Sequence, residues 1–323
     1  MARRVFVWVM VLLMAVCLLP GCGDNTKKQQ TDVQTNTQPE DDKSIRKTVL
    51  YFRDASGYIV PVMRKIPVEE GIAKAALKCL VAGGDEDIKL ASFGVTAPIP
   101  AGTTIDLDIA GGAATVNLKM AKKCDDRAAE EAMVTAVVNT LLEFATVEKV
   151  SLQVNGQAVE KLPNGAELKA SYTEQILNIE PAGAPNGADG KLQLCFANST
   201  GRLIVPVYRV AGDPVSLAVA LSEMLEPAKD TGLVALFPPS CDVLGATVSD
   251  DGVATIEFSS EFNAITDTPA METMALRAIG SVCRQFHGVK EFKIVAGGKE
   301  FEPSVSTAKV GSVPGDEYLN YYN

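Results

Sequence analysis

The side chains that most often carry catalysis or bind metal ions are scarce in this sequence. The 323 residues include one histidine and one tryptophan, and aromatic residues make up only 6% of the chain. The seven cysteines form no Cys-x-x-Cys pair, so neither a zinc site nor a thioredoxin-like redox motif is indicated. Basic residues number 30 against 40 acidic ones, which gives a net charge of −10. A chain with a net negative charge lacks the basic surface that binds nucleic acid, and we expect no nucleic-acid partner.

The single histidine offers little basis for acid–base catalysis. His287 is expected at the end of a helix, just before Gly288, where a cation interacts favourably with the helix dipole. Ser281 lies six residues earlier, and a helix places residues six apart on different turns, so a Ser-His pair is not favoured. We therefore predict no catalytic residues and no enzymatic activity.

The paired carboxylates are better explained as surface and turn residues than as a binding site. Asp106 and Asp108 share one face of an expected strand, while Asp125-Asp126 and Asp250-Asp251 fall in expected turns. Such pairs can hold a hard cation or act as acid and base, but no loop with ligand spacing accompanies them. The glycine pairs of the chain also lack the Lys-Ser or Lys-Thr of a phosphate-binding loop. The sequence thus predicts neither a metal site nor a cofactor site.

The first 22 residues have the features of a lipoprotein signal peptide. Two arginines precede an uncharged apolar run from Val5 to Leu19, which is too short and too close to the terminus for an ordinary spanning helix. The run ends in Leu19-Pro20-Gly21-Cys22, which resembles the lipobox of bacterial lipoproteins, so Cys22 is the predicted lipid attachment site. Pro20 departs from the small residue usual at that position, and a plain secretory signal or an uncleaved anchor is the alternative.

A polar tether is expected behind the signal. Residues 23–46 are rich in Thr, Gln, Asn, Asp and Lys, a composition that predicts disorder. Removal of residues 1–21 takes away two arginines and no acidic residue, so the net charge changes from −10 to −12. We predict that the mature protein lies on the extracytoplasmic face of the cell membrane, held there by lipid. Protein surfaces, basic patches or cations are the partners that suit its charge.

The body of the chain contains an internal duplication. Ile59-Val60-Pro61-Val62-Met63-Arg64 returns as Ile204-Val205-Pro206-Val207-Tyr208-Arg209, displaced by 145 positions, and Tyr51 corresponds to Phe196 at the same offset. The offset falls to between 139 and 142 after residues 83–98, where the first copy carries about six extra residues. A period this long indicates tandem globular domains and not a solenoid.

Each copy reads as strand, strand, helix, strand, strand, helix, strand. Apolar residues alternate with polar ones in the expected strands and form one stripe on each second helix. We predict an α+β fold class with two tandem repeats of a small β-β-α-β-β-α-β unit, in which two helices pack on one face of a sheet. Because proline cannot donate a ladder hydrogen bond, Pro61 and Pro206 are predicted on edge strands, with a bulge as the alternative. Contacts between molecules are then expected to use helical or other faces.

These boundaries predict six segments along the chain. They are the signal peptide 1–22, the tether 23–46, the first domain 47–175, a linker 176–190 rich in Pro, Gly and Ala, the second domain 191–303, and the tail 304–323. The tail is polar until Tyr318-Leu319-Asn320-Tyr321-Tyr322, which is expected to dock on a domain, with contact to a partner as the alternative.

Five cysteines remain in the predicted mature body outside the lipidation site. Within the duplication most of them exchange with apolar residues, which indicates small core side chains and not a disulfide framework. We expect free, mostly buried thiols, with one disulfide as the alternative. The residues are Cys79, Cys124, Cys195, Cys241 and Cys283.

Both copies resemble the GerM domain family. In the first copy the likeness lies in Tyr51-Phe52-Arg53-Asp54, in Val60 to Arg64, in the Ile99-Pro100-Ala101-Gly102-Thr103 turn, and in Asn139-Thr140-Leu141-Leu142-Glu143-Phe144 before a strand that ends at Asn155-Gly156. It covers residues 46–157 and 190–302. The second copy is degenerate, because residues 280–286 replace the helix motif with one more residue before the phenylalanine.

The resemblance implies a function without catalysis. GerM domains are similar in fold to the ring-building modules of secretion-type assemblies. The implied role is a structural or assembly factor of the envelope in sporulation or spore germination, with exported envelope or spore-assembly proteins, or further copies of the chain, as partners. The alternative is a ligand-binding lipoprotein that holds a small solute or cell-wall fragment between the two domains. A cleft lined by aromatic residues would favour that alternative.

Overall fold

The computed structural model describes residues 45–68, 71–173, 177–180, 191–210, 215–304 and 319–322. All of them belong to one compact unit, Asp42–Asn323. The predicted signal peptide, with Cys22, and the tether up to residue 44 lie outside the described residues, as do most of the linker and tail. None of the helices that the structure describes is long and apolar enough to cross a membrane.

Both repeats contain the expected order of elements, with a few short additions. The first repeat comprises β1 (Ile45–Asp54), β2 (Ile59–Pro67), α1 (Ile72–Lys78), α2 (Asp87–Ser92), β3 (Val95–Thr96), β4 (Thr104–Ala110), β5 (Ala113–Lys119), α3 (Arg127–Leu142) and β6 (Lys149–Val154). The second comprises β8 (Lys191–Asn198), β9 (Ile204–Val210), α4 (Leu217–Leu225), β10 (Leu233–Val234), β11 (Val243–Val248), β12 (Val253–Phe258), the 3-10 helix η1 (Ser260–Asp267), α5 (Pro269–Cys283), β13 (Glu291–Ala296) and β14 (Lys299–Glu300). Two further short strands follow the repeats, β7 (Ile179–Glu180) and β15 (Tyr321–Tyr322).

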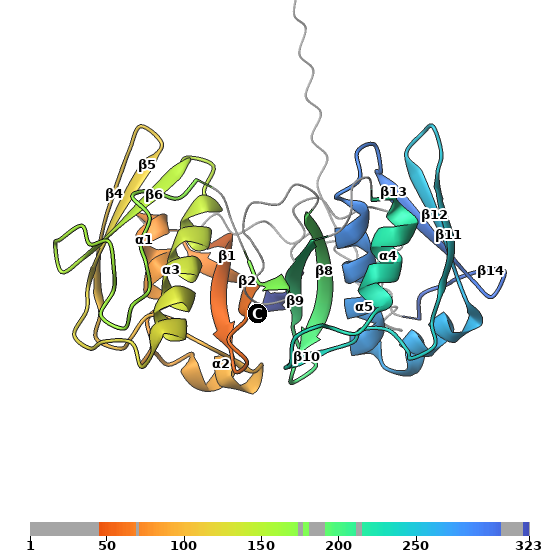
Figure 1. Cartoon of the computed structure of the whole chain (residues 1–323), viewed down its shortest axis with the longest axis horizontal. Coiled ribbons are helices and arrows are strands. Elements are labelled where there is room, and N and C mark those ends of the chain that lie inside the picture. Colours follow the sequence, from red (N-terminus) through yellow and green to blue (C-terminus); the bar gives the residue numbers. More distant parts are fainter. Residues whose placement is uncertain are drawn as a thin grey trace, which may run out of the picture. The chain divides into compact units, whose positions relative to one another are not determined.

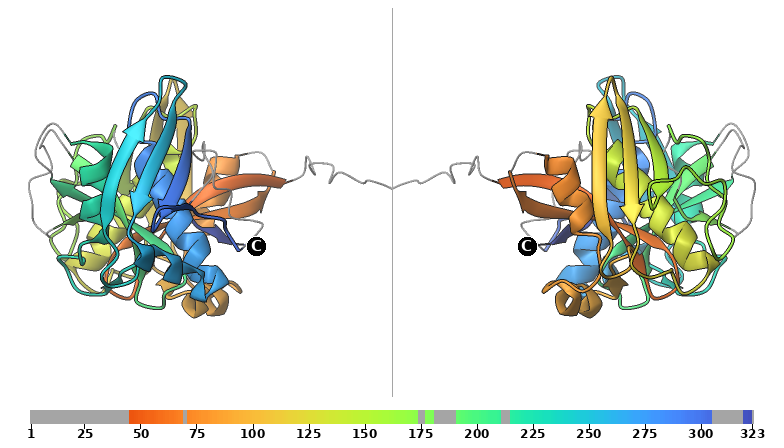
Figure 2. Two further views of the ribbon diagram at one scale, coloured as in Figure 1. Left: turned by 90° about the vertical axis from the view of Figure 1, so that its right-hand side faces the viewer. Right: turned by 90° about the vertical axis from the view of Figure 1, so that its left-hand side faces the viewer.

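Each repeat has three layers, with helices between two sheets. The sheets have the strand orders β15-β2-β1-β3 and β4-β5-β6 in the first repeat, and β10-β8-β9-β7 and β11-β12-β13-β14 in the second. In Figure 1, α1 and α3 lie between the two sheets of the first repeat, and α4 and α5 between those of the second. Figure 2 views the same repeats from the sides of β4-β5-β6 and β11-β12-β13. The α+β prediction therefore holds, except that the strands of each repeat divide between two sheets.

The helices α3 and α5 are buried on both sides, which explains why apolar residues occur around most of their circumference. Asp126 begins α3 as its N-cap and accepts a hydrogen bond from Ala129 N at 2.7 Å, which satisfies one of the free N–H groups of the first turn. Its buried positions then run without a gap from residue 136 to residue 141, whereas a helix on one sheet would bury a single stripe. Thr268 caps α5 in the same way, with Pro269 at the first helical position.

The second sheet of each repeat combines one hairpin with one helical crossover. β4 and β5 pair antiparallel around Gly111-Gly112, and β11 and β12 pair antiparallel around Asp251-Gly252, as the turn residues predict. β5 then pairs in parallel with β6 after α3, and β12 with β13 after α5.

The structure corrects the alignment of the first strands by one residue. Phe52 lies opposite Val60 in the first hairpin, and Phe196 lies opposite Val205 in the second. Phe52, and not Tyr51, is therefore the counterpart of Phe196, and both phenylalanines are fully buried. The shift arises in the turn between the two strands, which spans residues 54–58 in the first repeat and residues 198–203 in the second. The second turn is one residue longer.

The insertion in the first repeat forms an element of its own. The extra residues predicted between 83 and 98 contain α2, which is six residues long. Cys124, Cys195, Cys241 and Cys283 are buried free thiols, as predicted, and Cys79 is only partly buried.

Candidate functional site

The described part of the junction between the repeats contains two asparagines at equivalent positions. Asn178 directly precedes β7, which follows the first repeat, and Asn320 directly precedes β15, which follows the second. Leu177-Asn178-Ile179 and Leu319-Asn320-Tyr321 are 142 positions apart. This is also the offset between β6 and β13, so the two segments belong to the duplication.

The Asn178 side chain connects the first strand pairs of the two repeats. Its Oδ1 accepts a hydrogen bond from Ile59 N at 2.8 Å, and its Nδ2 donates to Ile59 O at 2.7 Å. The same Nδ2 donates to Pro206 O in the other repeat at 2.7 Å. One amide group thereby satisfies three backbone groups, which a side chain without both a donor and an acceptor cannot do.

Asn320 makes the same bonds with the repeats exchanged. Its Oδ1 accepts from Ile204 N at 2.6 Å, and its Nδ2 donates to Ile204 O at 2.7 Å and to Pro61 O at 2.8 Å. Asn320 is buried, so these bonds replace water contacts that it lacks. The duplicated Ile-Val-Pro-Val segments therefore meet at the junction through two equivalent asparagines.

The short strand after each asparagine also completes a sheet of the other repeat. β7 pairs in parallel with β9, and β15 pairs in parallel with β2. Main-chain bonds begin with Tyr208 N, which donates to Asn178 O at 2.9 Å, and with Met63 N, which donates to Asn320 O at 2.9 Å. The repeats thus exchange short strands reciprocally within one chain.

The prediction that Pro61 and Pro206 lie on edge strands is wrong. β2 lies between β1 and β15, and β9 lies between β8 and β7. The prolines are tolerated because the parallel pairing starts two residues after each of them, at residues 63 and 208. At the prolines themselves an asparagine side chain bonds the carbonyl, so the missing N–H leaves no ladder bond unmade.

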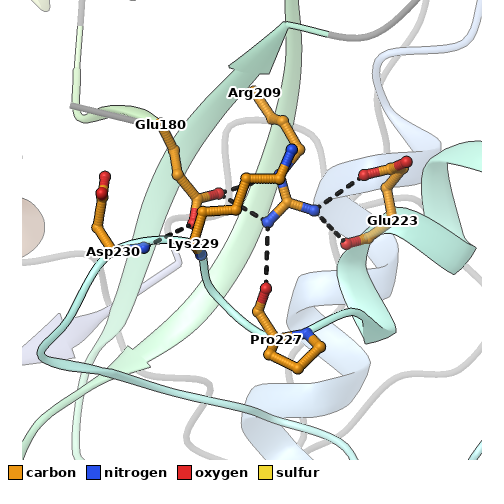
Figure 3. A network of polar contacts seen from close by, with 6 residues as sticks. All are labelled: Glu180, Arg209, Glu223, Pro227, Lys229 and Asp230. Atoms are coloured by element: carbon orange, nitrogen blue, oxygen red, sulfur yellow. Dashed lines mark hydrogen bonds and ion pairs between the residues drawn. The ribbon is translucent and has the colours of Figure 1, made fainter. Parts of the chain in front are cut away.

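A buried ion pair connects β7 to the second repeat (Figure 3). Arg209 donates from Nε and Nη2 to Glu180 Oε2 at 3.0 and 2.7 Å, and the two residues are only 1% and 0% exposed. Arg209 Nη1 donates to Glu223 O and Oε2, each at 2.9 Å. Glu180 Oε1 accepts from the backbone N–H groups of Lys229 and Asp230. A buried pair is stable only when its remaining polar atoms are satisfied in this way.

The equivalent arginine of the first repeat has a different environment. Arg64 forms its ion pair with Glu86 at 2.8 Å, and the Glu86 side chain is 49% exposed. Glu86 is the N-cap residue of α2 and therefore belongs to the insertion. The two repeats thus share the asparagine contacts but differ in the charges that accompany them.

The insertion contributes a second contact between the repeats. The turn between β8 and β9 binds the C-terminal end of α2, because Asn198 Nδ2 and Thr200 Oγ1 donate to Phe93 O at 2.8 and 3.0 Å. Arg202 Nη1 donates to Ser92 O at 2.9 Å. These donors satisfy carbonyls that the end of a helix leaves without intrahelical partners.

A cavity of about 470 Å³ lies at the junction. Four of its lining residues are the duplicated pairs Pro61 and Pro206, and Leu177 and Leu319. The cavity is therefore built by both repeats around their shared pattern, and its volume falls in the range of small-molecule sites. It is the described feature that best meets the expectation of a cleft between the domains.

A family model described as Germane, "Sporulation and spore germination", matches residues 49–160 and 193–302. This chain belongs to the Germane family. The two matched segments coincide with the two repeats, which confirms the resemblance drawn from the sequence.

The chain is similar over most of its length to GerM of Bacillus subtilis, both in sequence and in solved structure. Over 293 residues the chain is 26% identical to the spore germination protein GerM of Bacillus subtilis (strain 168), and the match covers 86% of this chain and 80% of that protein. The solved structure of the tandem GerMN domains of the sporulation protein GerM from Bacillus subtilis has a TM-score of 0.63 and 24% identity, and the match covers 87% of this chain and 100% of that one. This second likeness shows the tandem fold.

The polar residues singled out in the sequence do not line the junction cavity of this Germane chain. His287 is exposed after the end of α5, whereas Ser281 is buried and accepts a hydrogen bond from Gln193 Nε2 at 3.2 Å. Asp106 forms an ion pair with Lys119 at 2.6 Å, and that hydrogen bond lowers the pKa of its carboxyl group. No group of three or more His, Cys, Asp or Glu residues suited to a metal ion occurs in the part of the chain that the structure describes.

Sequence reasoning missed a second pair of equivalent residues, two buried glutamates. Glu130 on α3 accepts hydrogen bonds from Asn164 N at 2.7 Å and Ala166 N at 3.1 Å. Glu272 on α5 accepts from Ser304 N at 2.6 Å and from the Ser304 hydroxyl. The two glutamates are 142 positions apart, and this offset of the duplication could have revealed the pair. Each glutamate holds the segment that leaves its repeat toward the junction.

Proposed function

We propose that this chain is a non-enzymatic, exported protein, anchored to the extracytoplasmic face of the cell membrane by lipid at Cys22. It acts in sporulation or spore germination as a structural or assembly factor through protein contacts. Membership of the Germane family and the match to GerM over most of both chains support the process. Exported envelope or spore-assembly proteins, or further copies of the chain, are the partners.

One observation carries the structural role, the reciprocal exchange of β7 and β15. A binding protein of the hinge type opens and closes its domains around a ligand. Here each repeat contains a strand of the other, and the Glu180–Arg209 pair is buried within that contact. Repeats held in this way present a constant surface on both sides of the junction, which suits a scaffold that other proteins bind.

The test is recovery of partners from membranes with the full chain. Tagged wild-type protein, a Cys22→Ser variant and an Asn178→Ala/Asn320→Ala variant are isolated from membranes of growing and of sporulating cells. We expect exported proteins to co-purify with the wild type during sporulation, and less so with the junction variant. Cys22→Ser is expected to leave the membrane fraction. A monomer that brings down no exported protein in either state would contradict the proposal.

The alternative, a ligand-binding lipoprotein, is favoured by the cavity at the junction. That cavity has tyrosines in its lining but is open and preformed, so ligand binding there requires no hinge motion. The assembly role and a ligand site are therefore compatible in one molecule.

A further inference from the structure

The strand β11 is a free sheet edge in the part of the chain that the structure describes. It ends the order β11-β12-β13-β14, and no described strand pairs with its other side. Ser249 N donates to Val253 O at 3.0 Å, and the register then pairs Val248 with Ala254. Because bonded and non-bonded pairs alternate in an antiparallel ladder, the backbone groups of Val248 and Ala246 point away from β12. β11 thus presents backbone donors and acceptors to a further strand.

The exposed side chains of this edge include two large apolar ones and no charge. Leu244 is 60% exposed and Val248 is 47% exposed, and no residue of β11 is charged. The bulge of the strand lies between Val243 and Gly245, so residues 245–248 form a regular edge. Natural proteins usually protect an edge with charges or proline. β11 has neither, so the proline argument that directed contacts between molecules to other faces does not apply to it.

The equivalent edge of the first repeat is protected by charge. β4 ends the order β4-β5-β6, and Asp106 and Asp108 are exposed on it. If two copies of β4 paired antiparallel around Leu107, Asp106 of one copy would lie opposite Asp108 of the other. Like charges directly opposite each other are destabilising, and Lys119 offsets only one of them. The duplication therefore contains one edge that opposes self-pairing and one that does not.

The exposed residues of β11 are complementary to those of a second copy of the strand. Antiparallel pairing centred on Ala246 places Leu244 of one copy opposite Val248 of the other, and the same contact recurs across the two-fold axis. The two Ala246 residues then exchange two backbone hydrogen bonds, because their N–H and C=O groups point outward. Cross-strand apolar pairs of this kind stabilise a sheet.

We infer that two copies of this chain associate through β11, antiparallel and centred on Ala246, so that their outer sheets form one continuous sheet. The contact uses the same patch on both copies, which gives a closed dimer and not an open chain. A contact of a few residues is small, so the dimer is reversible. The inference rests on the proposed function in one respect, because it assigns a surface to further copies of the chain, which are among the partners proposed there.

Sedimentation velocity of the full chain, purified in detergent, measures the association from about 5 to 500 μM. We expect the wild type to pass reversibly from monomer to dimer. Leu244→Asp/Val248→Asp places like charges opposite each other twice and should weaken association at least about tenfold. Leu244→Lys/Val248→Asp places a cation opposite an anion in the same register and should restore the dimer. All three proteins share the same detergent, so the differences among them report on β11.

Cysteine trapping tests the register of the contact. The Cα atoms of a bonded antiparallel pair lie about 5.5 Å apart, within the range of a disulfide, so Ala246→Cys should form a covalent dimer under mild oxidation. Leu107→Cys, at the equivalent position of β4, is the matched control and should not. The wild type under the same oxidant measures the contribution of the native thiols. Cooperative unfolding of each variant confirms that it is folded.

Three results overturn the inference. They are a wild type that stays monomeric up to the highest concentration, a Leu244→Lys/Val248→Asp variant that associates no better than Leu244→Asp/Val248→Asp, and covalent dimers of Leu107→Cys as abundant as those of Ala246→Cys. Recovery of exported proteins from sporulating membranes tests the proposed function separately. A folded monomer that still brings them down refutes the dimer alone.

Discussion

The asparagines at the junction combine a donor and an acceptor at a place where the backbone needs both. Asn320 bonds Ile204 N, Ile204 O and Pro61 O in a buried environment. A leucine or alanine there would leave these backbone groups without partners. The cost of such groups is larger than the net gain from making an ordinary hydrogen bond.

Substitution of Asn320 by alanine should therefore lower the free energy of unfolding by about 2–4 kcal/mol. Asn263→Ala is the control, because Asn263 is exposed and donates only to Ser260 O at the surface; its effect should stay within about 0.5 kcal/mol. Urea titration of both variants measures the difference. Equal midpoints for the two variants would show that the Asn320 bonds do not hold the junction.

The buried arginine of the second repeat makes a second prediction at this scale. Arg209→Met leaves the Glu180 carboxylate buried without its cation and should cost about 3–5 kcal/mol of unfolding free energy. The equivalent change in the first repeat, Arg64→Met, removes a pair whose glutamate is half-exposed and should cost less, because the Glu86 carboxylate left behind stays in contact with water.

A double variant checks the cause of the Arg209 effect. In Glu180→Leu/Arg209→Met no charge is left buried without a partner, so the loss should be smaller than in Arg209→Met alone. Chemical unfolding of the three variants decides the matter. A double variant less stable than Arg209→Met would mean that packing, or the backbone N–H groups of Lys229 and Asp230 that Glu180 accepts from, outweighs the unpaired charge.

At the scale of elements, the short strand β15 closes the outer side of β2. Removal of the last five residues, 319–323, should expose the backbone of β2 on that side and deprive Met63 N of its partner, Asn320 O. Hydrogen exchange should therefore speed up at Met63 and not in β12, which belongs to the other repeat and to an outer sheet. Removal of residue 323 alone is the control. Unchanged exchange at Met63 would contradict the pairing.

The long elements were predictable from the sequence because they carry periodic patterns. The helices α3 and α5 and the hairpin turns at residues 111–112 and 251–252 follow from their residues alone, and the duplication predicts two equal units. β7 and β15 were not predictable from periodicity, because two-residue strands contain no period. The prolines led to the prediction that β2 and β9 are edge strands, because proline cannot donate a ladder hydrogen bond. That reasoning does not foresee a short strand that pairs beyond the proline.

The candidate site was predictable only in outline. A cleft between the domains was an open alternative, but its lining depends on how the repeats meet. Leu177-Asn178 and Leu319-Asn320 could have been found from their constant offset. The other lining residues could not, because side chains of both repeats, such as Leu142 and Tyr208, meet around one cavity only through the tertiary contact.

At the scale of the whole molecule, the exchange of strands should join the two repeats into one cooperative unit. Tandem domains with a small interface unfold separately, each with its own transition. In this chain the sheets of both repeats, the asparagine contacts and the Glu180–Arg209 pair all cross the junction. Unfolding of one repeat therefore removes a strand and several buried contacts from the other.

Scanning calorimetry of the full chain tests this claim most directly. We predict a single transition whose calorimetric and van't Hoff enthalpies agree, and its separation into two transitions in Asn178→Ala/Asn320→Ala. Two independent transitions in the wild type, one for each repeat, would contradict the account of the junction.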